Sequence, residues 1–351
     1  MVLYRKYRPQ KISELDLEEI REKLTRTLVS NYKPHAYLFS GPKGTGKTSA
    51  ARIVAKILNC EKNKSEKNQE PCNQCESCKA ITEGRYLDVI EIDAASNRGI
   101  DEIRDLKEKI RLAPTGGQTK VYIIDEVHML TNDAFNALLK TLEEPPVHAV
   151  FILATTEADR LPDTILSRSS KFVFNKAQKH EILHSLKRVA TGEKIRIEEE
   201  ALSLIAEHAD GSFRDATKIL EQALNQNYSK YAEIARMLGW DSISPEAFLQ
   251  ELKAGEVKKL LESIVTLGQK GTDLRLFTAE ILNIIHKLLL DAHGIRQNDL
   301  QQDLINIFTN SEINKLIKLF SQIYADLKFA SRPELPLETA VVEWCNRGKE
   351  V

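Results

Sequence analysis

Short runs of apolar and β-branched residues mark the first half of the chain. Five of them, at residues 36–39, 87–92, 121–124, 150–154 and 171–174, have the length of buried strands. They alternate with segments that carry helical spacing, the pattern typical of a parallel sheet with crossover helices. The sequence therefore predicts an α/β domain over residues 1–175.

Beyond residue 175 the strand pattern stops and amphipathic helical patterns take its place. Apolar residues recur three and four positions apart, as at Leu202, Ile205, Ala206 and Ala209. Residues 241–245, with the sequence DSISP, combine turn and helix-capping residues and favour a boundary there. We predict an all-α lid over residues 176–240 and an all-α C-terminal domain over residues 241–351.

Composition limits the partners. The 351 residues include 50 Lys and Arg against 51 Asp and Glu, a net charge of -1, so any contact with nucleic acid must be local. The longest apolar stretches, such as residues 281–290, are too short to span a bilayer. We expect a cytoplasmic protein that makes no membrane contact.

A glycine-rich loop follows the first predicted strand and precedes a helical pattern. It fits the motif G-x-x-x-x-G-K-T, whose backbone N–H groups cradle phosphates while the lysine reaches the β- and γ-phosphates and the threonine offers a hydroxyl to Mg²⁺. The motif predicts a site for ATP and Mg²⁺. Its residues are Gly41, Pro42, Lys43, Gly44, Thr45, Gly46, Lys47 and Thr48, and Ser49 follows in the helix.

Polar residues also end two later strands, and all three ends are expected at the same edge of the sheet. Asp125 suits a water-mediated contact with Mg²⁺, and Glu126 suits polarisation of the attacking water. Thr155 and Thr156 follow the fourth strand, where a hydroxyl could hold water or the γ-phosphate. Threonines at a strand end are also ordinary β-formers.

Four cysteines, Cys60, Cys72, Cys75 and Cys78, have the spacing C-x11-C-x2-C-x2-C. Four thiolates can complete a tetrahedron around Zn²⁺ and leave no position open for water, so we predict a structural zinc module at residues 60–79. An iron–sulfur cluster is the chemical alternative. We expect loss of the metal to melt this module with little effect on ATP binding. Cys345 stands apart, and we expect it to be a buried apolar residue.

Together these motifs resemble the tau/gamma family of bacterial DNA polymerase III clamp-loader subunits, which are AAA+ ATPases. The resemblance covers nearly the whole chain. It rests on the P-loop, the cysteine cluster and further stretches at residues 4–9, 35–41, 91–96, 122–130, 135–146, 154–156, 166–168 and 211–216.

The resemblance implies roles that the residues alone do not. Thr156 becomes a sensor of the γ-phosphate, Arg214 a lid residue that touches the nucleotide of its own subunit, and Arg168 a finger inserted into a neighbour's ATP site. Taken singly, either arginine is more often a surface residue. The N-terminal element adds Tyr7, Arg8 and Pro9 to the nucleotide contacts.

The resemblance also implies a function. The family carries a P-loop domain, lid and collar in one chain, and the collars form a hetero-oligomeric ring, pentameric by resemblance. The expected activity is ATP hydrolysis coupled to opening a sliding clamp and loading it onto primer-template DNA, within the polymerase III holoenzyme but without polymerase activity of its own. We expect DNA to be held by its phosphates at helix starts, with residues 97–101 and 131–133 as candidates that capping explains equally well.

The chain departs from the family pattern in three places. Ser169 replaces the cysteine of the Ser-Arg-Cys motif, the Gly-Gln pair after the N-terminal element is missing, and the segment between Cys60 and Cys72 is longer. The missing pair leaves adenine recognition undefined. Two alternatives remain: an AAA+ motor that remodels DNA junctions, and a non-hydrolysing scaffold subunit of the same loader, against which Lys47, Thr48 and Glu126 argue.

Overall fold

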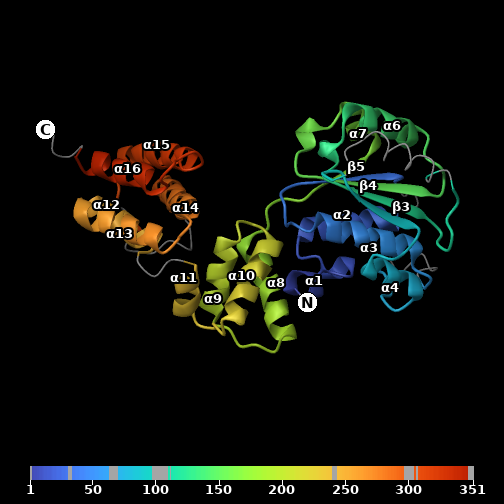
Figure 1. Ribbon diagram of the computed structural model, residues 1–351, viewed down its shortest axis with the longest axis horizontal. Helices are drawn as coiled ribbons and strands as arrows, with labels where there is room; N and C mark the ends of the chain where they lie inside the picture. Colours follow the sequence, from blue (N-terminus) through green and yellow to red (C-terminus); the bar gives the residue numbers. More distant parts are fainter. Residues whose placement is uncertain are drawn as a thin grey trace. The chain divides into compact units, whose positions relative to one another are not determined.

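The computed structural model describes residues 2–30, 34–62, 70–96, 110, 112–238, 243–295, 304–305 and 307–346 (Figure 1). The chain forms two compact units that divide between Ser229 and Lys230. The first contains the sheet and the helices that follow it directly, and the second is helical throughout its described residues.

A five-stranded parallel sheet forms the centre of the first unit. Its strands are β1 (Ala36–Ser40), β2 (Val89–Asp93), β3 (Lys120–Asp125), β4 (Ala149–Thr155) and β5 (Ser170–Val173), in the order β2-β3-β4-β1-β5. The central strands β1, β3 and β4 are buried almost throughout, as expected of parallel strands covered on both faces. The predicted sheet is confirmed, with ends that differ by one or two residues: exposed Leu87 precedes β2, and Phe174 follows β5.

Helices cover both faces of this sheet, and α3 and α6 lie on opposite sides of it (Figure 1). Apolar residues of α6, among them Phe135 and Leu138, pack in the same core as Tyr122 of β3 and Phe151 of β4. The described helices and short 3₁₀ turns of residues 2–168 are α1 (Leu3–Lys6), η1 (Ile12–Glu14), α2 (Glu18–Val29), α3 (Lys47–Asn59), α4 (Glu76–Glu83), η2 (Val127–Met129), α6 (Asn132–Glu143), η3 (Ala158–Arg160) and α7 (Asp163–Arg168).

The strand order determines where chemistry can occur. The P-loop follows β1, Asp125 ends β3 and Thr155 ends β4, which lies between the other two. Because the strands are parallel, their carboxyl ends meet at one edge. The amide of Gly41 donates to the carbonyl of Thr155 over 3.1 Å and joins the start of the P-loop to β4.

Three helices, α8 (Lys179–Gly192), α9 (Glu199–His208) and α10 (Phe213–Asn225), complete the first unit. The side chain of Ser212 caps α10 by accepting from the amide of Asp215 over 3.2 Å. Buried leucine, isoleucine and alanine side chains line the inner faces of these helices, as the helical pattern predicted. That residues 176–240 form a separate lid domain stays a prediction.

The second unit contains α11 (Tyr231–Met237), α12 (Pro245–Ala254), α13 (Val257–Gln269), α14 (Leu274–Ala292), α15 (Asn310–Asp326) and α16 (Glu334–Asn346). Its core includes Phe248 and Phe277, whose rings meet edge to face with centroids 5.5 Å apart. Cys345 is partly buried against this core. The predicted boundary at residue 241 lies outside the described residues. Among those described, no helix combines the length and the apolarity needed to cross a bilayer.

Candidate nucleotide and metal sites

The P-loop adopts a backbone that its glycines permit. Gly41, Gly44 and Gly46 have φ of 142°, 83° and 101°, a region that favours glycine. A Cβ at Gly41 would lie 2.0 Å from the carbonyl oxygen of Phe174, and one at Gly44 would lie 2.0 Å from the hydroxyl of Ser212. The loop is therefore packed between the end of β5 and the start of α10.

Lys47 begins α3 and is 6% exposed. Its ammonium donates to the carbonyls of Gly41 over 2.6 Å and Pro42 over 2.8 Å, so the side chain lies back along the loop. Burial lowers the pKa of Lys47, whereas the charges of Glu126 and Asp125 act to raise it. The charge is thus held where polyphosphate oxygens would meet it.

The acidic pair lies beside the loop. The hydroxyl of Thr48 donates to Oδ2 of Asp125 over 2.9 Å, which brings together the two groups predicted to hold Mg²⁺. Oε2 of Glu126 accepts from the hydroxyl of Thr156 over 3.0 Å and from its amide over 3.3 Å. Glu126 also has a φ of 48°, an uncommon backbone conformation for a residue with a side chain.

One residue near Glu126 was not predicted. Nδ1 of His128 lies 2.9 Å from the hydroxyl of Thr155 and 3.5 Å from Oε2 of Glu126, and its Nε2 lies 3.3 Å from Glu157. The sequence shows His128 two positions after Glu126, close to the end of β3. Its contact with Thr155 depends on the alignment of β3 with β4, which the sequence does not state.

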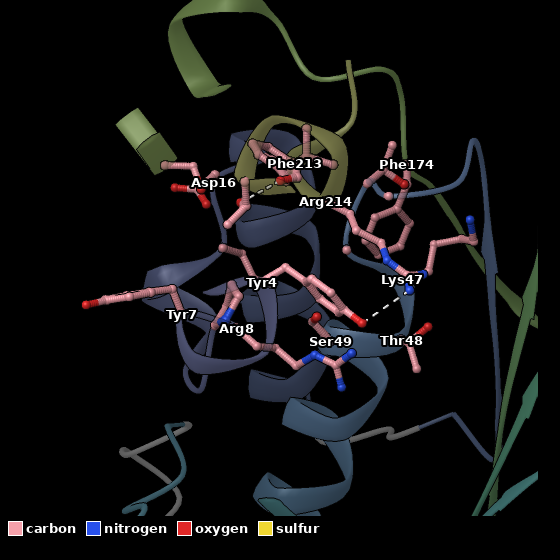
Figure 2. Close-up of a pocket in the computed structure, with 18 of the residues that line it drawn as sticks. Tyr4, Tyr7, Arg8, Asp16, Lys47, Thr48, Ser49, Phe174, Phe213 and Arg214 are labelled. Carbon is pink, nitrogen blue, oxygen red and sulfur yellow. Dashed lines mark hydrogen bonds between the residues drawn. The ribbon is translucent and has the colours of Figure 1, made fainter. Parts of the chain in front are cut away.

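Lys47, Thr48, Asp125 and Glu126 line the same cavity in the first unit, part of which Figure 2 shows. Of the predicted nucleotide contacts, Gly41, Pro42 and Thr156 do not line it. The carbonyls of Gly41 and Pro42 accept from Lys47, and the hydroxyl of Thr156 donates to Glu126, so their contact with nucleotide stays a prediction. The lining of the cavity combines cations suited to phosphates with apolar surface suited to a base.

The residues that line the cavity are Tyr4, Arg5, Tyr7, Arg8, Pro9, Leu15, Asp16, Leu17, Ile20, Lys43, Gly44, Thr45, Gly46, Lys47, Thr48, Ser49, Asp125, Glu126, Phe174, Ser185, Arg188, Val189, Phe213, Arg214 and Thr217.

The far end of the cavity, away from the P-loop, is formed by residues between Tyr4 and Ile20 and by α8 and α10. The guanidinium of Arg214 lies over the ring of Tyr4, 4.8 Å from its centroid, and Nη2 is 3.5 Å from the phenolic oxygen (Figure 2). The amide of Phe213 donates to the carbonyl of Gly44 over 3.1 Å, which links α10 to the P-loop. Tyr7 points away from the P-loop residues in Figure 2, and its ring lies against Gly192.

An ion pair that sequence analysis did not predict also lies at this end. Arg188 donates through Nη1 to Oδ1 of Asp16 over 3.0 Å and through Nη2 to Oδ2 over 2.8 Å. The side chain of Asp16 is 4% exposed, and Nδ1 of His184 lies 2.9 Å from Oδ1. Asp16 falls in the region where the expected Gly-Gln pair is missing.

Arg168 lies outside the cavity. It ends α7, its Nη1 donates to the carbonyl of Thr164 over 3.0 Å, and its Nη2 pairs with Glu143 over 3.0 Å. Its side chain is 37% exposed. Arg168 therefore does not reach the end of its own chain's cavity that Lys47, Thr48, Asp125 and Glu126 line, which we call the phosphate end.

The four cysteines form a compact cluster. The sulfurs of Cys60, Cys72, Cys75 and Cys78 all lie within 4.8 Å of one another. The amides of Gln74 and Cys75 donate to the sulfur of Cys72 over 3.4 and 3.3 Å. Burial acts to raise the pKa of Cys72, but these hydrogen bonds outweigh it and lower that pKa, whereas burial raises the pKa of Cys60 and of Cys78. The fit to a metal therefore rests on the closeness of the four sulfurs and on the amides that donate to them.

Two surface segments had been predicted to contact DNA. Residues 97–101 lie outside the described residues. Thr131 caps α6, because its hydroxyl accepts from the amide of Ala134 over 3.3 Å and its carbonyl accepts from the amide of Phe135 over 2.9 Å. Capping accounts for Thr131, and DNA contact by residues 131–133 stays a prediction.

Comparison with known proteins places this architecture in a family. A model described as "DNA polymerase III, delta subunit" matches residues 17–178, and one described as "DNA polymerase III clamp loader subunit, ATPase lid domain" matches residues 181–228. The DNA polymerase III subunit gamma of Buchnera aphidicola subsp. Acyrthosiphon pisum is 41% identical over 288 residues, 80% of this chain and 77% of that protein. The chain belongs to the DNA polymerase III gamma/tau family.

Longer members of the gamma/tau family are similarly related. The DNA polymerase III subunit tau of Bacillus subtilis is 39% identical over 99% of this chain, and that of Escherichia coli is 39% identical over 82%. The chain spans 64% and 45% of those two relatives. The structure of the Thermotoga maritima RuvB Holliday junction branch migration motor covers 76% of this chain at 18% sequence identity and a TM-score of 0.49. This similarity is too low to support an inference about function.

Proposed function

We propose that this chain is an ATP-hydrolysing subunit of a DNA polymerase III clamp loader, which opens a sliding clamp and loads it onto primer-template DNA. The observation that carries the proposal is the convergence of Lys47, Thr48, Asp125 and Glu126 at one end of a cavity, in a chain of the gamma/tau family. The sequence predicted this convergence from separate motifs.

Each group at the phosphate end has a separate task. The amides of the P-loop and the ammonium of Lys47 would bind the β- and γ-phosphates, in exchange for the carbonyls that Lys47 now contacts. Thr48 and Asp125 would hold Mg²⁺, which supplies charge neutralisation between the phosphates when bound. Glu126 would polarise the attacking water. Thr156, whose hydroxyl donates to the carboxylate of Glu126, would act as the sensor of the γ-phosphate.

Two arginines would complete the charge balance. Arg214 lines the cavity at the start of α10, where it can reach the nucleotide of its own chain. Arg168 is outside this cavity and paired with a half-exposed Glu143, a contact that costs little to exchange. We assign it to the ATP site of a neighbouring subunit in a ring, with residues 241–351 as the collar.

The cysteine cluster would bind a structural Zn²⁺ through Cys60, Cys72, Cys75 and Cys78. Four close sulfurs, with backbone amides that donate to them, fit a closed thiolate site. A site with four protein ligands has no open position for a reaction, so its contribution is structural.

The test is ATP hydrolysis by the purified chain, assembled with its partner loader subunits, with and without clamp and primer-template DNA. Stimulation that requires both clamp and primed DNA is expected, and Glu126→Gln assemblies serve as the hydrolysis-deficient control. Stimulation by branched DNA without the clamp would instead indicate a junction-remodelling motor. ATP binding without hydrolysis by this subunit would indicate a scaffold.

A further inference from the structure

The N-terminal segment, residues 8–14, joins the nucleotide cavity to the cysteine module, by which we mean residues 60–62 and 70–83. Arg8 and Pro9 line the cavity. A few residues later, the carboxylate of Glu70 accepts from the amides of Ile12 and Ser13, each over 2.8 Å. The module thus holds this segment by its backbone, across a sequence separation of more than fifty residues.

A second set of contacts centres on Lys56 of α3, which is 1% exposed. Its ammonium donates to the side-chain oxygen of Gln10 and to that of Asn73, the latter over 3.0 Å. Asn73 in turn donates to the carbonyl of Gln10 over 3.3 Å. Leaving a buried ammonium short of acceptors is costly, so Lys56 ties both partners firmly in place.

Gln10 carries this connection to the cavity. Its side-chain amide donates to the carbonyl of Arg8 over 2.9 Å, and its oxygen also accepts from the hydroxyl of Thr82 over 3.3 Å. The path from the module to a residue that lines the cavity therefore consists of hydrogen bonds between adjacent groups.

The sulfurs determine where Asn73 lies. Asn73 follows Cys72 and has a φ of 55°, in a turn whose next two amides both donate to the sulfur of Cys72. Glu70 precedes Cys72 by two residues. Whatever holds the sulfurs together also holds the two side chains that contact the N-terminal segment.

We propose that the cysteine module is a positioning element for the nucleotide cavity, acting through Glu70, Asn73, Lys56 and Gln10 on Arg8 and Pro9. The proposal rests on the nucleotide binding proposed above. It differs from our expectation from the sequence that metal loss would have little effect on ATP binding, which rested on indirect coupling between the module and the phosphate pocket, and the experiment below decides between the two.

The experiment measures affinity for a fluorescent ATP analogue, zinc per chain and hydrogen exchange of residues 8–14 in the full chain. Glu70→Ala and Asn73→Gly each remove one connection, and glycine tolerates the backbone of Asn73. We expect affinity to fall roughly 3- to 10-fold in each. Exchange at Ile12 and Ser13 should accelerate while zinc stays at one equivalent. Glu70→Gln, which keeps one acceptor oxygen, should restore part of the affinity.

Glu61→Ala is the matched control. Glu61 also accepts two hydrogen bonds, from the amide and hydroxyl of Ser77 over 3.2 and 2.9 Å, but both lie within the module. It should leave affinity unchanged. Removal of zinc from the wild-type chain should weaken nucleotide binding about as much as the double variant Glu70→Ala/Asn73→Gly does. Removal of zinc from that double variant should weaken its nucleotide binding little further.

The outcomes separate this proposal from the proposed function. If the wild-type chain binds no nucleotide, the assignment of the cavity fails. If it binds, but metal removal and both variants leave its affinity unchanged, the positioning role is wrong. An equal loss in Glu61→Ala would also contradict it, since general weakening of the module would then explain the effect. Metal analysis that finds iron, or none, would overturn the zinc assignment alone.

Discussion

The two ends of the cavity are built in different ways. The phosphate end comes from seven consecutive residues, 43–49, and from two acids, Asp125 at the end of β3 and Glu126 directly after it. The other end combines residues between Tyr4 and Ile20 with helices near residues 188 and 214, joined by contacts such as that between Tyr4 and Arg214. One end depends on local backbone conformation and strand order, whereas the other depends on tertiary contacts between distant segments.

This difference affects what each end can tolerate. At the phosphate end, Gly41 and Gly44 lie so close to neighbouring atoms that even a methyl group would displace the loop. At the other end, ion pairs and ring contacts hold side chains that have other rotamers available. We therefore expect substitutions at the phosphate end to stop binding or hydrolysis and those at the other end to reduce them by degrees.

The largest effect should come from Arg168, which tests whether the phosphate end is complete within one chain. Arg168→Ala should reduce hydrolysis by about 10³ to 10⁵, the contribution of arginine fingers in comparable hydrolases. Glu126→Gln should also nearly abolish turnover while binding persists. Mixing the two variants under subunit exchange should restore activity in part, because some interfaces then pair an intact Glu126 with an intact Arg168.

The control for this experiment is each variant alone, with exchange confirmed by labelled subunits. If Arg168 served its own chain, every site in the mixture would lack one of the two groups, and hydrolysis would stay absent. That result would make the phosphate end self-sufficient and remove the argument for a shared site.

Lys47→Ala should have the next largest effect, on binding itself. The ammonium is buried at the start of α3, where two carbonyls and the nearby acids offset its charge. Its loss should weaken affinity for ATP by roughly 1.5 to 3.5 orders of magnitude, because a buried charge that serves a ligand is worth about 2–5 kcal/mol. Calorimetric titration measures this, with circular dichroism to verify folding. Unchanged affinity would contradict the assignment of the P-loop.

The same difference explains what the sequence could predict. The P-loop, Asp125 and Glu126 were found because their spacing within a strand, loop and helix implies their geometry. The pair of Asp16 with Arg188 was not, since nothing at either position indicates a partner 172 residues away. The hydrogen bonds of Gln10 were likewise missed, because they involve a lysine in the interior of α3 and an asparagine in the cysteine module.

Asp16→Asn should have the smallest effect and tests the tertiary end directly. Asparagine keeps the shape of Asp16 but leaves Arg188, whose side chain is 29% exposed, without its charged partner. The free energy of unfolding should fall by about 2 kcal/mol, less than the 3–5 kcal/mol typical of a fully buried pair because Arg188 retains some contact with water. Nucleotide affinity should fall only several-fold, because the residues that we propose to bind phosphate are untouched.

A double-mutant cycle separates the pair from its surroundings. Combining Asp16→Asn with Arg188→Gln should recover part of the loss of stability, since the second change removes the unpaired cation.

The pair of Lys176 with Asp210 provides the matched control, through the variants Lys176→Gln and Asp210→Asn. Nζ of Lys176 lies 2.7 and 2.8 Å from the two carboxylate oxygens of Asp210, but the side chains of Lys176 and Asp210 are 58% and 75% exposed. The coupling of this pair should be near zero and no more than about 1 kcal/mol. Equal coupling in both cycles would mean that the Asp16 pair is an ordinary surface contact, and that the far end of the cavity is held by apolar packing of Leu17, Ile20 and Val189 instead.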